Sequence, residues 1–196
     1  MRSSLKLLED FQSANEKLSR PRTENQNGAA WKPPLPGSFK VNVDGALFSK
    51  SKLSSVGVIV RDEEGNVIAA MSRKMNSPLG ALQTEAKALE IGVKFAEEVG
   101  LRDVVFEGDS QLIINAVHGI GEVEAPVQNI IQGMLRKAQS FRTFDFLHIK
   151  RQGNIPAHLL AQHAQNVENV VVWLKDCPSQ VAHACAHDVS VLQHIE

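Results

Sequence analysis

Three acidic side chains, Asp44, Glu85 and Asp109, are the residues of this sequence best placed to do chemistry. Asp44 and Asp109 each follow a short apolar segment typical of a strand, and Glu85 borders the apolar stripe of a helical segment between them. Carboxylates from a strand, the following helix and the next parallel strand can converge and bind Mg²⁺ or Mn²⁺ through oxygen. Two such ions about 4 Å apart activate a water for phosphodiester hydrolysis, so we predict a two-ion site.

Each acid also has an ordinary structural interpretation. The dipeptide at Asp44 and Gly45 is common in turns at strand ends, and Asp109 or Ser110 could simply cap a helix. A lone glutamate such as Glu85 is most often a solvated residue on a helix surface. The metal-site hypothesis therefore depends on the three carboxylates meeting, and a separation beyond about 8 Å would exclude a paired-metal site.

Hydrophobic periodicity predicts the elements that would position these acids. Period-two alternation and β-branched runs indicate five strands, over residues 39–44, 56–61, 67–71, 104–106 and 144–149. Apolar spacing of three and four residues indicates four helices, over residues 80–99, 112–117, 126–138 and 154–166. The order βββαβααβα predicts an α/β fold with a five-stranded mixed sheet, helices on both faces and a right-handed crossover.

A chain of 196 residues suits one domain with flanking segments. We expect residues 1–38 to form an amphipathic helix followed by a linker rich in Pro, Asn and Gly, and residues 39–167 to form the folded domain. Residues 168–196 are expected to be a tail, of which 170–174 could pack back on the domain. The linker and the poorly patterned ends favour a remnant of a larger polyprotein.

Composition narrows the possible functions and locations. The net charge of −1 means that nucleic acid must bind through a local basic surface or a bound metal. Two cysteines fit a reducing compartment, and no apolar run is long enough to span a membrane. We therefore expect a soluble, intracellular and monomeric protein with no membrane partner, in the nucleus or the cytoplasm.

Other chemistries receive little support. Four residues that could bind zinc lack a CxxC pair and the usual finger spacing; they are Cys177, His183, Cys185 and His187. Glycine-rich phosphate loops and nucleophile elbows are absent from the sequence. His148, on the last predicted strand, is expected to be packed and hydrogen-bonded rather than catalytic. Lys150 and Arg151 beside that strand are the expected phosphate contacts, with a solvated strand end as the alternative.

Motifs in order and at matching spacings make the chain resemble the plant retroelement-type branch of the type 1 ribonuclease H family over about residues 31 to 175. They are Trp31-Lys-Pro-Pro, Lys40-Val-Asn-Val-Asp44-Gly-Ala46, Gly57-Val-Ile-Val-Arg61-Asp62 with Gly65, Thr84-Glu85-Ala86, Glu107-Gly-Asp109-Ser-Gln111, and Asn154 with Ala157-His158-Leu-Leu-Ala161. The resemblance implies a ribonuclease H-like fold, in agreement with the order of the predicted elements.

The resemblance also implies roles for individual residues. Asp44, Glu85 and Asp109 match three of the family's four metal-binding carboxylates. Ser110 and Gln111 lie where the family contacts the substrate backbone or 2′-hydroxyl, and Asn154 is placed with these substrate-binding residues.

His158 occupies the position of the fourth acid, which is Asp in most active ribonucleases H. Imidazole can ligate a metal or shuttle a proton, so His158 stays among the expected catalytic residues. It removes a negative charge, however, and suits Mg²⁺ poorly. Activity is therefore expected to be weakened, shifted towards Mn²⁺ or lost.

Three functional hypotheses follow. The leading one is a metal-dependent endonuclease that hydrolyses the RNA strand of RNA–DNA hybrids and reads the 2′-hydroxyl. The second is a module that binds nucleic acid or a protein partner and no longer turns over, because His158 replaces an acid. The third is a non-nuclease α/β domain, since one fold can carry different functions.

Overall fold

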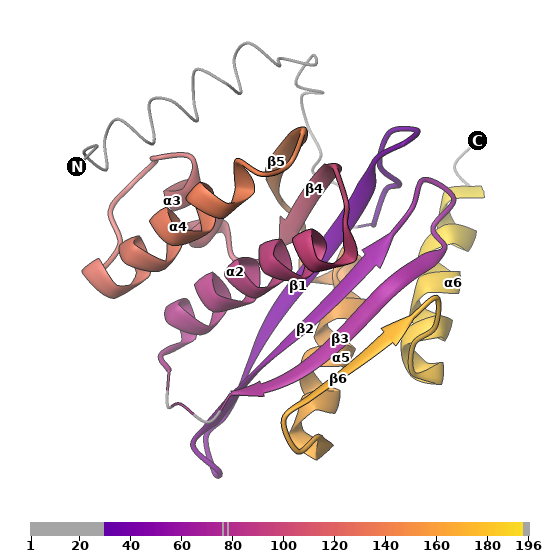
Figure 1. Ribbon diagram of the computed structural model, residues 1–196. Coiled ribbons are helices and arrows are strands. Elements are labelled where there is room, and N and C mark those ends of the chain that lie inside the picture. The colour runs from indigo at the N-terminus through magenta and orange to yellow at the C-terminus, as the bar shows by residue number, and fades with distance from the viewer. Residues whose placement is uncertain (1–29, 76, 78, 194–196) are drawn as a thin grey trace.

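A six-stranded mixed sheet lies at the centre of the computed structural model, which describes residues 30–75, 77 and 79–193 (Figure 1). In chain order its strands are β1 (Phe39–Phe48), β2 (Leu53–Arg61), β3 (Val67–Met75), β4 (Asp103–Gly108), β5 (Thr143–His148) and β6 (Val170–Leu174). Their order across the sheet is β5-β4-β1-β2-β3-β6. Strands β5, β4 and β1 are parallel, and the β1–β2, β2–β3 and β3–β6 pairs are antiparallel.

Helices cover both faces of this sheet. In the labels of Figure 1 they are α2 (Ala81–Val99), α3 (Gln111–Val117), α4 (Ala125–Ala138), α5 (Ile155–His163) and α6 (Ser179–Gln193). Helices α2, α3 and α4 lie on one face, and α5 and α6 lie on the other (Figure 1). The predicted α/β class, mixed sheet and two-sided helix packing are confirmed. No described helix is long and apolar enough to cross a membrane.

The alternation of side chains along the strands divides the core in two. On β2, Val58 belongs to the core under α2, and its neighbour Ile59 belongs to the core under α5 and α6. Glycines allow the closest approaches: an added Cβ at Gly57 would lie 2.2 Å from the carbonyl oxygen of Ala157, and one at Gly92 would lie 2.5 Å from Val43. Larger residues at either position would push a helix away from the sheet.

Local signals in the sequence mark most of the element ends. Gly100 ends α2 in the left-handed conformation with φ of 85°, as its position after the helical pattern predicts. Asp62 and Gly65 close the turn between β2 and β3, where the amide of Gly65 donates to the carbonyl of Asp62. The strands β1 and β2, by contrast, extend beyond their predicted ends, since both stay paired as far as Phe48 and Leu53.

The amino-terminal boundary differs from the expected linker. Trp31 has no exposed surface, and the guanidinium carbon of Arg61 lies 3.8 Å from the centroid of its ring. Pro34 is also buried. Packing onto the domain therefore begins at least eight positions before the predicted start at Phe39, because a buried arginine needs a partner for its charged face. The helix predicted within residues 1–19 lies outside the described residues.

The expected carboxy-terminal tail forms two elements. Strand β6 adds a sixth strand by pairing antiparallel with β3, so the predicted count of five was wrong. Helix α6 buries Val181 and Cys185 against α5, and its Asp188 pairs with Arg61. Val181 and Cys185 are the buried apolar residues of α6, and its third buried contact is the ion pair of Asp188 with Arg61. Hydrophobic periodicity does not detect an ion pair, so the sequence pattern did not predict this helix.

Candidate active site

The three acidic residues come from three elements that meet where β4 ends. Asp44 lies within β1 opposite Gly57, so the strand continues through it and the alternative of a turn at Asp44 is wrong. The parallel pairing of β1 with β4 stops at Val43 and Gly108, and Asp109 follows at once. Parallel strands leave room for a ligand beyond their carboxyl ends, which is where Asp109 stands.

Glu85 reaches this point because α2 passes very close to β1. A Cβ added at Gly45 would lie 2.8 Å from Cγ2 of Thr84 and 3.1 Å from its carbonyl oxygen. The missing side chain at Gly45 therefore lets the first turn of α2 rest directly on the strand. The backbone of Gly45 also lowers the pKa of the Glu85 carboxyl and so partly opposes the effect of burial. Gly45 is a positioning residue that the sequence analysis considered only as part of a turn.

The carboxylates of Asp44, Glu85 and Asp109, hereafter the acidic cluster, each offer an oxygen within 4.8 Å of the others. Their separation is well inside the limit of about 8 Å set for a paired-metal site. Within the described residues, no other group of three or more His, Cys, Asp or Glu side chains converges in this way. The cysteines and histidines considered for zinc do not form such a group there.

The acidic cluster carries more negative charge than its surroundings balance. Asp44 is 1% exposed, and burial raises the pKa of its carboxyl to about 6. Burial raises the pKa of Glu85 to about 8, with repulsion from Asp44 and Asp109 adding to the effect. A divalent cation would relieve both the burial penalty and the repulsion, so the donor set fits a hard cation.

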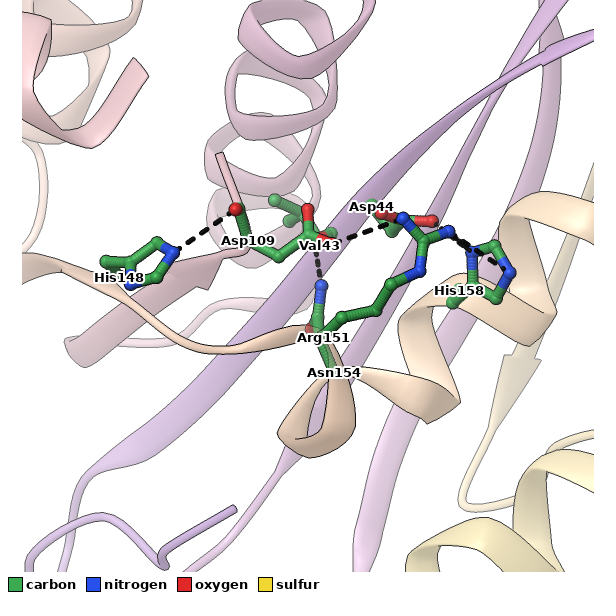
Figure 2. A network of polar contacts seen from close by, with 7 residues as sticks. All are labelled: Val43, Asp44, Asp109, His148, Arg151, Asn154 and His158. Carbon is green, nitrogen blue, oxygen red and sulfur yellow. Dashed lines mark hydrogen bonds and ion pairs between the residues drawn. The ribbon is translucent and has the colours of Figure 1, made fainter. Parts of the chain in front are cut away.

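His158 and Arg151 form the other side of the site (Figure 2). Nδ1 of His158 lies 2.8 Å from Oδ2 of Asp44. Arg151, on the loop between β5 and α5, places Nη2 2.9 Å from Nδ1 and 3.3 Å from Nε2 of His158. Its Nη1 lies 3.7 Å from Oδ2 of Asp109. A chain of polar contacts therefore runs from Arg151 to Asp44 and leaves Arg151 facing Asp109.

One tautomer of neutral His158 suits its contact with Asp44. Arginine has only donors, so the ring nitrogen that faces it must accept, while the nitrogen that faces a carboxylate must donate. With the proton on Nδ1, His158 donates to Asp44 at 2.8 Å, and Nε2 is the ring nitrogen that can accept from Nη2 of Arg151, at 3.3 Å. The 2.9 Å contact of Nη2 with Nδ1 then joins two donors. Both nitrogens are then engaged. His158 serves Asp44 as a hydrogen-bond donor and has no lone pair directed at the acidic cluster.

The remaining predicted site residues fall into exposed and buried groups. Lys150 and Gln111 are exposed, and Ser110 is half-buried at the start of α3. Asn154 is completely buried, and its amide nitrogen donates to the carbonyl of Val43 (Figure 2). This hydrogen bond ties the loop before α5 to β1. The side chain of Asn154 does not cap α5.

His148 is packed as expected. Its Nε2 lies 3.2 Å from the carbonyl oxygen of Asp109, which places the imidazole beside the backbone of the acidic cluster (Figure 2).

The fold and the acidic cluster define the class of protein. Solved structures that superpose on the chain are ribonucleases H, at identities that establish the fold alone. Ribonuclease H1 of Halobacterium salinarum matches with a TM-score of 0.61 and 23% identity, over 66% of this chain and 98% of that one. The amino-terminal ribonuclease H domain of a Mycobacterium tuberculosis protein, solved as a maltose binding protein fusion, matches with a TM-score of 0.59 and 20% identity, over 66% and 94%. LC11-RNase H1 in complex with an RNA/DNA hybrid matches with a TM-score of 0.60 and 22% identity, over 65% and 96%.

The family follows from the sequence comparison. A family model described as reverse transcriptase-like matches residues 42–164, which is more than half of the chain. The chain belongs to this reverse transcriptase-like family, whose domain is ribonuclease H-like. No curated protein sequence matches it significantly.

Proposed function

We propose that this protein is a metal-dependent endonuclease that hydrolyses the RNA strand of RNA–DNA hybrids. The observation that carries the proposal is the convergence of three carboxylates within 4.8 Å beyond the end of a parallel strand. If these acids had only a structural role, the fold would be more stable with each one paired with a cation or placed apart, because neighbouring like charges repel.

Asp44, Glu85 and Asp109 would bind the divalent cation, Mg²⁺ or Mn²⁺, that the proposal requires. When bound, such a cation activates water and stabilises the leaving oxygen of the phosphodiester. The protein's own contribution is to hold the three carboxylates in place: Gly45 holds Glu85, His158 holds one oxygen of Asp44, and Asn154 fixes the loop that bears Arg151.

The substrate class rests on the residues around the acidic cluster. Lys150 and Arg151 are exposed beside it and carry the positive charge that a phosphate backbone needs. Ser110 and Gln111, at the start of α3, are accessible next to Asp109 and can meet a 2′-hydroxyl. The superposed LC11-RNase H1 was solved with an RNA/DNA hybrid, which supports the same ligand class here.

Cleavage of an end-labelled hybrid, in Mg²⁺ and separately in Mn²⁺, tests the proposal. We expect RNA-strand cleavage that depends on the metal and falls at least about a hundredfold in Asp109→Asn, because one ligand charge is lost. Glu168→Gln, which removes an exposed carboxylate away from the site, serves as the matched control and should cleave normally. Activity that survives Asp109→Asn would refute the site assignment.

A second candidate is a ribonuclease H-like module that binds nucleic acid or protein without cleaving it. The observation that favours it is His158, whose two ring nitrogens are both engaged and supply no fourth anionic ligand. Hybrid binding without cleavage in either metal, unaffected by Asp109→Asn, would establish this alternative.

A further inference from the structure

The proposed metal site already contains a positive charge that belongs to the protein. The guanidinium of Arg151 faces Asp109 at 3.7 Å and reaches Asp44 through His158 (Figure 2). An arginine cannot lose its proton in this setting, so the positive charge is permanent.

Charge balance limits the number of metal ions beside such a group. Three carboxylates carry three negative charges, which one divalent ion and one guanidinium neutralise in full. A second divalent ion would leave a net positive charge of two units within a few ångströms of Arg151, at a strongly unfavourable energy. Four carboxylates would balance two divalent ions, but the fourth position is His158.

The ligand geometry points the same way. Two metal ions about 4 Å apart need carboxylates whose two oxygens are both free to bind metal. Oδ2 of Asp44 already accepts the proton of His158, which leaves one oxygen of Asp44 for a metal. His158 does not replace the missing ligand in this arrangement, because Nδ1 is directed at Asp44 and Nη2 of Arg151 lies 2.9 Å from Nδ1 and 3.3 Å from Nε2.

We propose that Arg151 takes the place of a second cation, so that the acidic cluster holds one divalent ion per chain. This inference rests on the proposed function, since it concerns the same site. The Arg151 side chain is 59% exposed and can follow an arriving phosphate. It then supplies the positive charge at the phosphate that a second ion would otherwise provide, in the planar, two-donor geometry suited to phosphate oxygens.

Counting bound Mn²⁺ tests the inference without reference to cleavage. The full chain is titrated with MnCl₂, and free Mn²⁺ is measured by electron paramagnetic resonance. We expect one Mn²⁺ per chain in the wild type and two in Arg151→Ala combined with His158→Asp, which removes the guanidinium and restores a fourth carboxylate. Arg151→Ala alone should bind its single ion about tenfold more tightly, because a competing charge is gone.

Two variants separate charge from structural effects. Arg151→Lys keeps the positive charge and should still bind one ion, with an affinity near that of the wild type. Lys137→Ala removes an exposed positive charge on α4, a helix that holds no residue of the acidic cluster, and should change neither the stoichiometry nor the affinity. Thermal unfolding of every variant shows that the compared proteins are folded.

The outcomes distinguish this inference from the proposed function. Two ions in the wild type would overturn the role of Arg151 and leave the nuclease proposal standing. One ion in the wild type and also in the folded double variant would overturn it as well. No bound Mn²⁺ in the wild type would overturn the metal-dependent function itself, and this inference with it.

Discussion

Two groups of charged side chains lie against the same sheet, and they differ in how fully their charges are paired. The paired network comprises Lys40, Asn42, Arg61, Glu107 and Asp188. Lys40 binds Glu107 at 2.7 Å and Arg61 binds Asp188 at 2.7 Å, while Asn42 links the two pairs. The acidic cluster has three carboxylates and one half-exposed arginine. Paired buried charges support a fold, whereas a convergent unpaired set needs a ligand from outside.

Glu107 and Asp109 show the difference most directly, since one residue separates them in the sequence. Glu107 has a cation and an amide on its two oxygens and is 2% exposed. Asp109 has a single distant arginine. The alternation of β4 sends Glu107 into the packed side near Lys40, and the end of the strand frees Asp109 to turn towards the acidic cluster.

The largest expected effect comes from exchanging these two acids for their amides in turn. Glu107→Gln leaves Lys40 buried without an anion and should lower the free energy of unfolding by about 3–5 kcal/mol, measured by urea denaturation. Asp109→Asn should leave it unchanged or raise it, since it removes repulsion. Equal losses in both variants would mean that the two regions do not differ as described.

The anchor of α6 gives the next effect in size. Asp188→Asn weakens the buried pair with Arg61 and should lower the free energy of unfolding by about 2–3 kcal/mol. Asp176→Asn is the matched control, because that carboxylate is exposed and asparagine still offers an acceptor oxygen to the amide of Cys177. A change below about 0.5 kcal/mol for Asp188→Asn would show that α6 is held by its apolar contacts alone.

Metal binding should stabilise the acidic cluster and leave the paired network unaffected. Mn²⁺ at a hundred times its dissociation constant should stabilise the native protein by about 2.7 kcal/mol, and a chelator should reverse the effect. Asp44→Asn should abolish most of this shift in the thermal midpoint. Glu107→Gln, although less stable, should keep it. A shift of equal size in Asp44→Asn would place the metal elsewhere.

The smallest expected effect is on the pH dependence of stability without metal. Glu85 and Asp44 have pKa values of about 8 and about 6 in the fold, against the ordinary pKa values of 4.5 and 3.8 for these side chains. The native state therefore binds more protons than the unfolded state. The contribution of these two groups to the free energy of unfolding is fully present below about pH 4 and is lost as pH rises through about 8.

The thermal midpoint should accordingly fall by several degrees between pH 5 and pH 8 in the presence of a chelator. Glu85→Gln should flatten much of that fall, because an amide does not titrate. A midpoint that rises over this range in both proteins would contradict the unbalanced charge of the acidic cluster.

Much of the fold could be predicted from patterns that act locally. Period-two alternation located β1, the 3.6-residue stripe located α2, and Gly100 marked the end of that helix. Other elements depend on distant partners. Strand β6 exists because it pairs with β3, and Trp31 is buried because Arg61 lies beneath it. Neither partner is close in sequence, so the hydrophobic periodicity of a short segment does not predict the contact.

The candidate site divides in a similar way. The order and spacing of the sequence motifs identify Asp44, Glu85, Asp109 and His158 as the candidate site residues. The close approach of α2 at Gly45, the buried role of Asn154 and the place of Arg151 beside Asp109 became visible only in three dimensions. Each of these contacts joins segments dozens of residues apart in the sequence.

The amino-acid sequence by itself determined which acids could act and which elements would hold them, because side-chain chemistry and backbone periodicity are properties of short segments. Only the tertiary structure decided which charges are neutralised, since the partner of a buried charge is set by packing between remote elements. Two acids separated by one residue thus reach opposite outcomes: Glu107 is bound to Lys40, and Asp109 is left for a cation.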